Sequence, residues 1–189
     1  MENYYDKNSI EYINNTLNCD MSNIYNFFEP YLINSHNILD IGFGSGRDMI
    51  YFKNKGLDVY GIDPSIEMCN NAKRIGLSNV LNITAQELSF INKFDSIWAC
   101  ASLLHISSKE LIDVFIKCFK ALKKNGIMYC SFKYGEFEGI RDNRFFNDMT
   151  IEKLSIILNK SGLKIINSII TLDVRPDNST KWINVILKA

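Results

Sequence analysis

The sequence predicts an α/β fold, a three-layer sandwich around a seven-stranded, mostly parallel sheet whose last strand is antiparallel. Short apolar runs, typical of strands buried on both faces, alternate with segments of helical periodicity along most of the 189 residues. The first run, at 38–41, leads through a glycine-rich turn into a helix, as parallel strands require. The last two runs have no helix between them, so the final strand is expected to run antiparallel to its neighbour.

Composition limits the class of protein before any motif is considered. The length and the 47% apolar content suit one domain, residues 1–189, with a sizeable core. Lys+Arg and Asp+Glu number 21 each and no basic run is visible, so a nucleic-acid partner is disfavoured. No signal peptide or membrane-length apolar run is visible, which favours a cytoplasmic protein without a membrane partner. The sequence leaves open whether it is a monomer or a homodimer.

Cysteine and histidine usage argues against a metal site. The five cysteines are scattered without a C-x-x-C pair, and the chain has only two histidines. We therefore expect no metal, and we expect the cysteines to be free thiols packed mostly as small apolar groups.

The first half of the chain is expected to contain four helices and four strands. Helices are predicted at 8–17 and 23–33, with Ser22 as N-cap of the second and Pro30 bending its end. A helix at 48–55 follows the first strand and ends at Gly56. Strand 57–63 precedes a helix that has Pro64 near its first turn and Ser65 as its cap. Short strands are predicted at 80–83 and 94–100.

The second half begins with a helix predicted at 107–123, and a turn at 124–126 leads into strand 127–133. Residues 133–148 are polar and aromatic without clear periodicity, and we expect a long loop there. A helix capped by Thr150 is predicted at 150–162, followed by strands at 163–174 and 181–189.

The glycine turn after the first strand is the predicted binding site. Gly42, Gly44 and Gly46 are spaced G-x-G-x-G, so a ligand can approach bare backbone and the first amides of the helix. Asp63 ends the second strand, where a carboxylate can accept hydrogen bonds from both ribose hydroxyls. Asp40 precedes the glycines, where it repels a pyrophosphate and suits a cationic ligand. The dinucleotide fingerprint G-x-G-x-x-G is not matched, since the third glycine comes one residue early.

These features resemble the class I, Rossmann-like S-adenosylmethionine-dependent methyltransferases, small-molecule type. The matching positions are Asp40, Gly42, Gly44, Gly46 and Asp63, and the resemblance extends from Leu32 to the end. It implies S-adenosylmethionine as cofactor, with Asp40 near the methionine ammonium and Asp63 on the ribose. It also implies that the seventh strand inserts beside the fifth and sixth, and that residues 1–34 form an N-terminal helical cover.

The resemblance implies further cofactor contacts. Arg47 is a candidate for the methionine carboxylate. Thr84 stands where many relatives carry an aspartate, so adenine recognition is expected to move to Gln86 or to the backbone of Ala85. The remaining expected contacts flank the ribose acid or lie at the tip of the fourth strand: Pro64, Ser65, Met68 and Ala99.

The acceptor site is less specified. The tip of the fourth strand, residues 99–102, reads ACAS and lacks the N/D-P-P-Y/F/W acceptors of enzymes that methylate amino groups of nucleic acids or glutamine. His105 is a candidate general base, or alternatively a brace for its loop. Tyr5 either covers the core or faces the acceptor. Four further candidates for substrate binding lie in the polar 133–148 segment, which is alternatively a solvated lid: Lys133, Tyr134, Arg141 and Arg144.

The function predicted on this basis is methyl transfer from S-adenosylmethionine to a small-molecule acceptor. Three alternatives remain open from the residues. One is a nicotinamide-dependent oxidoreductase, which the glycine spacing and Asp40 oppose. The others are a non-catalytic S-adenosylmethionine-binding module and an RNA methyltransferase that acts with a partner.

Overall fold

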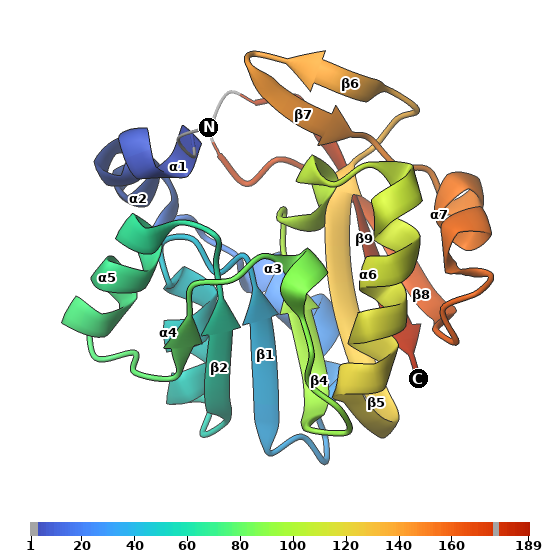
Figure 1. Ribbon diagram of the computed structural model, residues 1–189, viewed down its shortest axis with the longest axis horizontal. Helices are drawn as coiled ribbons and strands as arrows, with labels where there is room; N and C mark the ends of the chain where they lie inside the picture. The colour runs from blue at the N-terminus through green and yellow to red at the C-terminus, as the bar shows by residue number, and fades with distance from the viewer. Residues whose placement is uncertain (1–3, 176–177) are drawn as a thin grey trace.

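The computed structural model describes residues 4–175 and 178–189, and its centre is a seven-stranded sheet (Figure 1). The strand order is β3-β2-β1-β4-β5-β9-β8, and β9 pairs antiparallel with both β5 and β8 while β1 to β5 pair in parallel. This confirms the predicted sheet, including the insertion of the last strand. The strands are β1 Asn37–Ile41, β2 Asp58–Ile62, β3 Val80–Leu81, β4 Phe94–Ala99, β5 Leu122–Lys133, β8 Lys164–Leu172 and β9 Lys181–Lys188.

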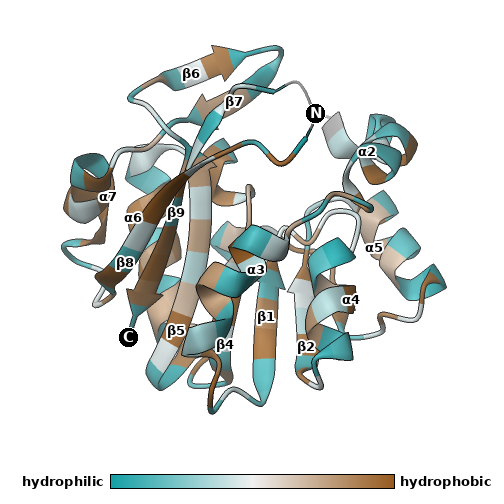
Figure 2. Ribbon diagram, turned by 180° about the vertical axis from the view of Figure 1, so that it is seen from behind, coloured by the Kyte–Doolittle hydropathy of each residue, from teal (hydrophilic) through white to brown (hydrophobic). Residues whose placement is uncertain are grey.

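Helices cover both faces of the sheet. Figure 2 shows α3 and α4 in front of the strands, whereas α6 lies in front of the sheet in the opposite view of Figure 1. The helices are α1 Tyr4–Lys7, α2 Ser9–Thr16, α3 Ser22–Phe28, α4 Arg47–Asn54, α5 Ile66–Arg74, α6 Ser108–Ala121 and α7 Ile151–Leu158. Within the described ranges, none of them has the length and apolar character that crossing a bilayer needs.

The central strands are buried on both faces, as their apolar runs predict. Neighbouring residues of β4 point to opposite sides: Ile97 joins the core under α6 and α7, and Trp98 joins the core under α3 and α4. Trp98 and Tyr129 of β5 are fully buried and stack with ring centroids 4.0 Å apart. The two cores therefore hold the sheet between helices and fix the strand ends at which the site lies.

Two of the predicted helix caps are present and one is not. Ser65 Oγ accepts a hydrogen bond at the start of α5, and Thr150 Oγ1 does the same at the start of α7. The prediction of Ser22 as a cap is wrong, since it is the first helical residue of α3. The preceding Asp20 accepts from the Ser22 backbone N–H at 2.9 Å instead. A carboxylate two residues upstream therefore supplies the acceptor expected from the serine.

The 133–148 segment forms a β-hairpin, so the prediction of a long loop is wrong. Strands β6 Glu138–Arg141 and β7 Arg144–Asn147 pair antiparallel across a two-residue turn. Asp142 and Asn143 both have positive φ, 51° and 59°, the combination found in type I′ hairpin turns. The hairpin lies beyond the carboxyl end of the sheet (Figure 1).

Side-chain hydrogen bonds fix the hairpin to the rest of the fold. Glu138 accepts from the backbone N–H of Ser108 at 2.8 Å, and Asn147 Nδ2 donates to the carbonyl of Ile106 at 2.9 Å. Asn147 is fully buried. The hairpin is therefore joined to the start of α6 at the same sheet edge as the glycine turn.

Candidate functional site

The glycine turn between β1 and α4 packs closely against its neighbours. Gly42 has a φ of 70°, and a Cβ on it would lie 2.5 Å from Ser102 Cβ. Gly44 has a φ of 52°, and a Cβ there would lie 2.9 Å from the ring of Tyr12. Both the backbone conformation and the close approach therefore require glycine at these two positions.

Asp40 places a buried acceptor beneath this turn. The residue is 2% exposed, and its Oδ2 has no hydrogen-bond partner in the described part of the chain. Burial raises the pKa of Asp40 well above its usual range, and the neighbouring acids add to the rise. A buried carboxylate oxygen without a donor is costly, so a ligand that brings a donor or a positive charge would be stabilised there.

Asp63 links the turn to the start of α5. Its carboxylate accepts hydrogen bonds at 2.9 Å from the backbone N–H groups of Gly44 and Ser65. Burial raises the pKa of Asp63 to about 6, and these two hydrogen bonds oppose the rise. The carboxylate thus lies at the end of β2, held against the glycine turn, where a ribose acid was predicted.

A cavity opens beside these groups, and we call it the glycine-side cavity. It is bounded by the glycine turn, the ends of β2 and β3 and the loop after β4. The side chains of Tyr5, Tyr12 and His105 also line it. The predicted cofactor residues that line it are Gly42, Gly44, Asp63, Pro64, Met68, Ala85 and Gln86.

The other predicted cofactor residues lie next to this cavity without lining it. Ser65 is fully buried and donates its hydroxyl hydrogen to Asp6 at 2.5 Å. Ala99 is fully buried at the end of β4. Gly46 has a φ of 83° at the start of α4, and its Cα faces the side chains of Ile75 and Leu77. None of these three positions lines the glycine-side cavity, and neither does Asp40.

Arg47 is engaged within the protein. Its guanidinium donates to both carboxylate oxygens of Asp48, at 2.7 and 2.9 Å, and to the Thr16 carbonyl at 3.3 Å. Asp48 also accepts from the Tyr25 hydroxyl at 2.5 Å and from Trp98 Nε1 at 2.8 Å. Arg47 lines a different cavity from the one beside the glycines, so its contact with a methionine carboxylate stays a prediction.

The second cavity, which we call the hairpin-side cavity, adjoins the first. The two share the side chains of Tyr5, Tyr12, Ala101 and His105. Among the predicted substrate residues, Tyr5, Lys133 and Arg144 line it. Tyr134 and Arg141 do not line it: Tyr134 is 44% exposed, and Arg141 donates to Asp148 at 2.8 Å.

His105 lies where the two cavities meet, with both ring nitrogens engaged. Nδ1 lies 2.7 Å from the carbonyl oxygen of Phe145, which can only accept, so Nδ1 carries the hydrogen. In the neutral ring Nε2 then accepts from the Tyr5 hydroxyl at 2.8 Å. Burial lowers the pKa of His105 below its ordinary value. The geometry therefore presents an unprotonated Nε2 at neutral pH, as a general base requires.

Several lining residues of the hairpin-side cavity were not expected from the sequence. Tyr12 of α2 covers Gly44. Polar groups from β5 and β9 form another wall, where the Tyr129 hydroxyl donates to Asn184 at 2.6 Å and Ser131 Oγ accepts from the Ala101 backbone N–H at 2.9 Å. Tyr129 and Ser131 alternate with apolar residues on the central strand β5. This departure from an unbroken apolar run is the sequence signal that could have identified them.

Comparisons with known proteins agree with the fold. A family profile described as "Methyltransferase domain" matches residues 38–126. The phosphoethanolamine N-methyltransferase of Plasmodium falciparum is 29% identical over 141 residues, which cover 67% of this chain and 53% of that protein. The chain spans about half the length of the curated relatives it matches.

Two solved structures have the same fold at low sequence identity. The 1,6-didemethyltoxoflavin-N1-methyltransferase of Burkholderia thailandensis, crystallised with bound 1,6-didemethyltoxoflavin and S-adenosylhomocysteine, superposes with a TM-score of 0.78 at 19% identity. The match covers 98% of this chain and 83% of that one. A methyltransferase from Methanosarcina mazei superposes with a TM-score of 0.75 at 20% identity, covering 87% of this chain and 97% of that one.

Proposed function

Because the chain belongs to the class I, Rossmann-like S-adenosylmethionine-dependent methyltransferases, we propose that it transfers a methyl group from S-adenosylmethionine to a small-molecule acceptor. The observation that carries the proposal is the pair of adjoining cavities. One lies against the glycine turn and Asp63, the other against the hairpin, and they meet at Tyr5 and His105. A cofactor and an acceptor bound side by side would need this arrangement.

The residues beside the glycine turn fit the cofactor. The partnerless Oδ2 of Asp40 suits the cationic end of S-adenosylmethionine, directly or through water. Asp63 would accept from the ribose hydroxyls, and Gly42 and Gly44 line the same cavity beside it. When bound, S-adenosylmethionine supplies an activated methyl group on its sulfonium. The protein itself therefore needs to position the two reactants, exclude water from the space between them and supply a proton acceptor.

Residues at the junction of the two cavities would perform these three tasks. Tyr5 and Tyr12 would exclude water from the space between cofactor and acceptor. Holding two reactants in line contributes up to about 7–11 kcal/mol. An acceptor hydroxyl or amine that replaces the Tyr5 hydroxyl at His105 Nε2 would deliver its proton there.

The N-terminal segment, residues 1–34, would act as a cover over both cavities; residues 1–3 lie outside the described part of the chain. Three contacts support this role. Tyr5 donates to His105 across 100 residues of sequence, and Asp6 accepts from Ser65. Tyr12 packs on Gly44. Movement of this segment would widen access to the glycine-side cavity, because Tyr5 and Tyr12 are among its lining residues.

A small molecule is the proposed acceptor for two reasons. The Plasmodium relative is named for phosphoethanolamine, a small metabolite. The net charge of zero gives no general attraction to a nucleic-acid backbone. We further propose that the protein is a monomer or homodimer in the cytoplasm, where its five cysteines would remain free thiols.

Asp63→Ala is expected to weaken the binding of S-adenosylhomocysteine by at least about tenfold, because a hydrogen bond to a charged group contributes about 1.5–3 kcal/mol. Isothermal titration calorimetry measures this. Asp58→Ala is the matched control, since Asp58 begins the same strand at the opposite edge of the sheet and is exposed. Unchanged affinity in Asp63→Ala would remove the ribose assignment, and no binding by the wild-type protein would remove the proposed function.

The affinity for S-adenosylhomocysteine is also expected to depend on pH through Asp63. Burial raises the pKa of Asp63 to about 6 in the free protein, and ribose hydroxyls bind the ionised form better. Binding therefore lowers this pKa, so the affinity should be full above about pH 7 and should fall as the pH decreases through 6. Asp40, whose pKa burial also raises, acts in the same direction. Calorimetry from pH 7.5 to 5 should show a shallower dependence in Asp63→Asn, where only the contribution of Asp40 remains.

A further inference from the structure

Three cationic side chains of the hairpin region surround one aromatic ring. Lys133 Nζ lies 4.2 Å from the centroid of the Phe146 ring. The guanidinium carbon of Arg144 lies 5.1 Å from the same centroid, and that of Arg141 lies 5.4 Å from it. The ring stabilises each cation modestly, but like charges at this spacing repel one another. The cluster is therefore a site at which negative charge would be stabilised.

Two nearby carboxylates are already hydrogen-bonded, one to Arg141 of the cluster itself and one to Arg175. Asp148 accepts from Arg141 at 2.8 Å, and Asp173 accepts from both Arg175 Nε and a terminal nitrogen of the same guanidinium. Within residues 4–175 and 178–189, no carboxylate forms an ion pair with Lys133. Burial lowers the pKa of Lys133, and the neighbouring guanidinium groups lower it further. The positive charge of Lys133 is thus only partly compensated.

The partly compensated charge of Lys133 faces the hairpin-side cavity. Lys133 and Arg144 line that cavity, whereas Arg141 points to Asp148 and does not. Phe146 also lines it, and its ring centroid lies 5.0 Å from that of His105. One ring therefore separates the cations from the predicted base, so the two groups can contact opposite ends of one small molecule.

We propose that the acceptor carries an anionic group, a phosphate monoester or a carboxylate, that binds Lys133 and Arg144 while its nucleophile lies at His105. This rests on the proposed function and names the class of its substrate. Arginine binds a phosphate or carboxylate with two parallel hydrogen bonds, and lysine adds a mobile point charge. The anion fixes the acceptor at one end, so that the methyl-accepting atom is placed beside the cofactor at the other.

Inorganic phosphate and acetate are the probes for this site. Each is titrated by calorimetry, in low-chloride buffer at pH 7.5, into protein already saturated with S-adenosylhomocysteine. We expect saturable binding of at least one anion by the wild-type protein. Lys133→Met, which keeps the length of the side chain and removes its charge, should weaken that binding by about tenfold. The anion that binds more tightly identifies the group, phosphate or carboxylate.

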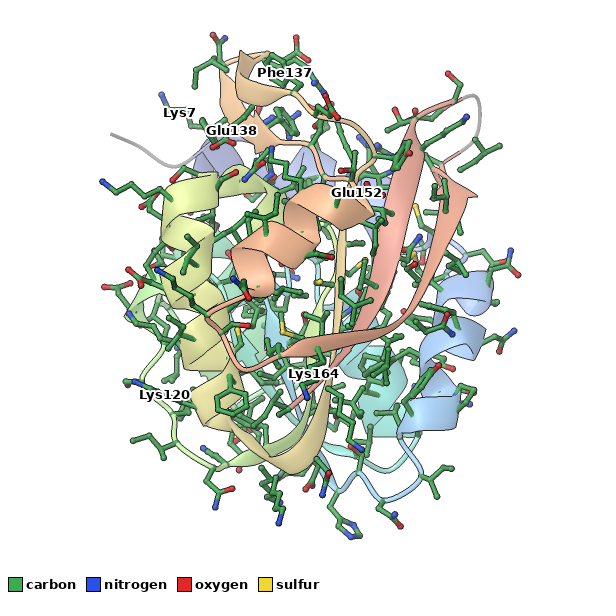
Figure 3. The ribbon with its side chains drawn as sticks, turned by 90° about the vertical axis from the view of Figure 1, so that its right-hand side faces the viewer. Lys7, Lys120, Phe137, Glu138, Glu152 and Lys164 are labelled. Atoms are coloured by element: carbon green, nitrogen blue, oxygen red, sulfur yellow. The ribbon has the colours of Figure 1, made fainter. Side chains whose placement is uncertain are left out.

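Two control variants separate charge from structure. Lys133→Arg keeps the charge and should bind the anion within about threefold of the wild-type protein. Lys120→Met removes an exposed lysine at the far end of α6 from Phe137 and Glu138 of the hairpin region, as Figure 3 shows, and should leave anion binding unchanged. Equal anion affinity in Lys133→Met and the wild-type protein, or no saturable binding of either anion, would overturn the proposal. Failure of the proposed function is seen separately, as absent S-adenosylhomocysteine binding before any anion is added.

Discussion

Asp48→Ala is expected to lower the free energy of unfolding by about 3–5 kcal/mol, the usual cost of breaking a buried ion pair by removing one partner. Asp48 is 6% exposed and accepts four hydrogen bonds: two from Arg47, one from Tyr25 and one from Trp98. Among the residues that the structure describes, its loss leaves the Arg47 guanidinium with only the carbonyl of Thr16 as a hydrogen-bond acceptor. Chemical denaturation followed by tryptophan fluorescence and circular dichroism measures the change.

The control for this prediction is Asp113→Ala, which removes an exposed carboxylate from α6 and should change stability by less than about 0.5 kcal/mol. Asp48→Asn should fall between the two, because the amide oxygen still accepts a hydrogen bond while the negative charge is gone. A loss below 1 kcal/mol in Asp48→Ala would show that Arg47 finds another partner, and the network would then not be a determinant of stability.

A smaller role for Asp48 can be read from the sequence alone, because it is an acidic residue in the first turn of α4, at the positive end of the helix. That interaction is local and can be read from a short segment. The larger role depends on Tyr25 and Trp98, which lie 23 and 50 residues away and approach only when α3 and β4 pack together. No local sequence pattern indicates a contact between residues so far apart in the chain. Buried polar networks of this kind are therefore the hardest part of a fold to predict from one sequence.

The regular part of the fold could be predicted because each element carries its own signal. Apolar runs marked the strands, and Ser65 and Thr150 marked the starts of α5 and α7. The hairpin was missed although Asp142 and Asn143, two residues that tolerate positive φ, stand between its strands. Its flanking strands are only four residues each, and half of their eight residues are polar, so the turn signal was the one to follow.

The candidate site was predictable where backbone geometry demands particular residues. Gly42, Gly44 and Asp63 were found because a sharp turn and a carboxylate at a strand end have few substitutes. The contacts of Tyr12 and Lys133 depend on how α2 and the hairpin pack over the sheet, which a sequence pattern does not specify. Tyr5, His105, Lys133 and Arg144 were candidates from the sequence, but their meeting around one cavity had to come from the structure.

His105→Ala is expected to reduce the rate of methyl transfer by about 10²–10⁴-fold, provided that the accepting atom must lose a proton. The reason is the hydrogen-bond pattern of the ring: the Phe145 carbonyl holds the hydrogen on Nδ1 and leaves Nε2 as an acceptor at the junction of the two cavities. The measurement is single-turnover transfer of a labelled methyl group to the acceptor. His36→Ala is the matched control, because it removes the only other histidine of the chain, ahead of β1 at the opposite edge of the sheet.

The pH dependence of the methyl-transfer rate distinguishes a general-base role of His105 from a purely structural one. Burial lowers the pKa of His105, so the ring is neutral at pH 7 and the wild-type rate should stay level there, then fall as the pH decreases through that lowered pKa. His105→Ala should lose this acidic limb and keep the affinity for S-adenosylhomocysteine, measured by calorimetry, within about threefold. If the slow variant instead retains the acidic limb, His105 holds Tyr5 and the hairpin in place, and another group accepts the proton.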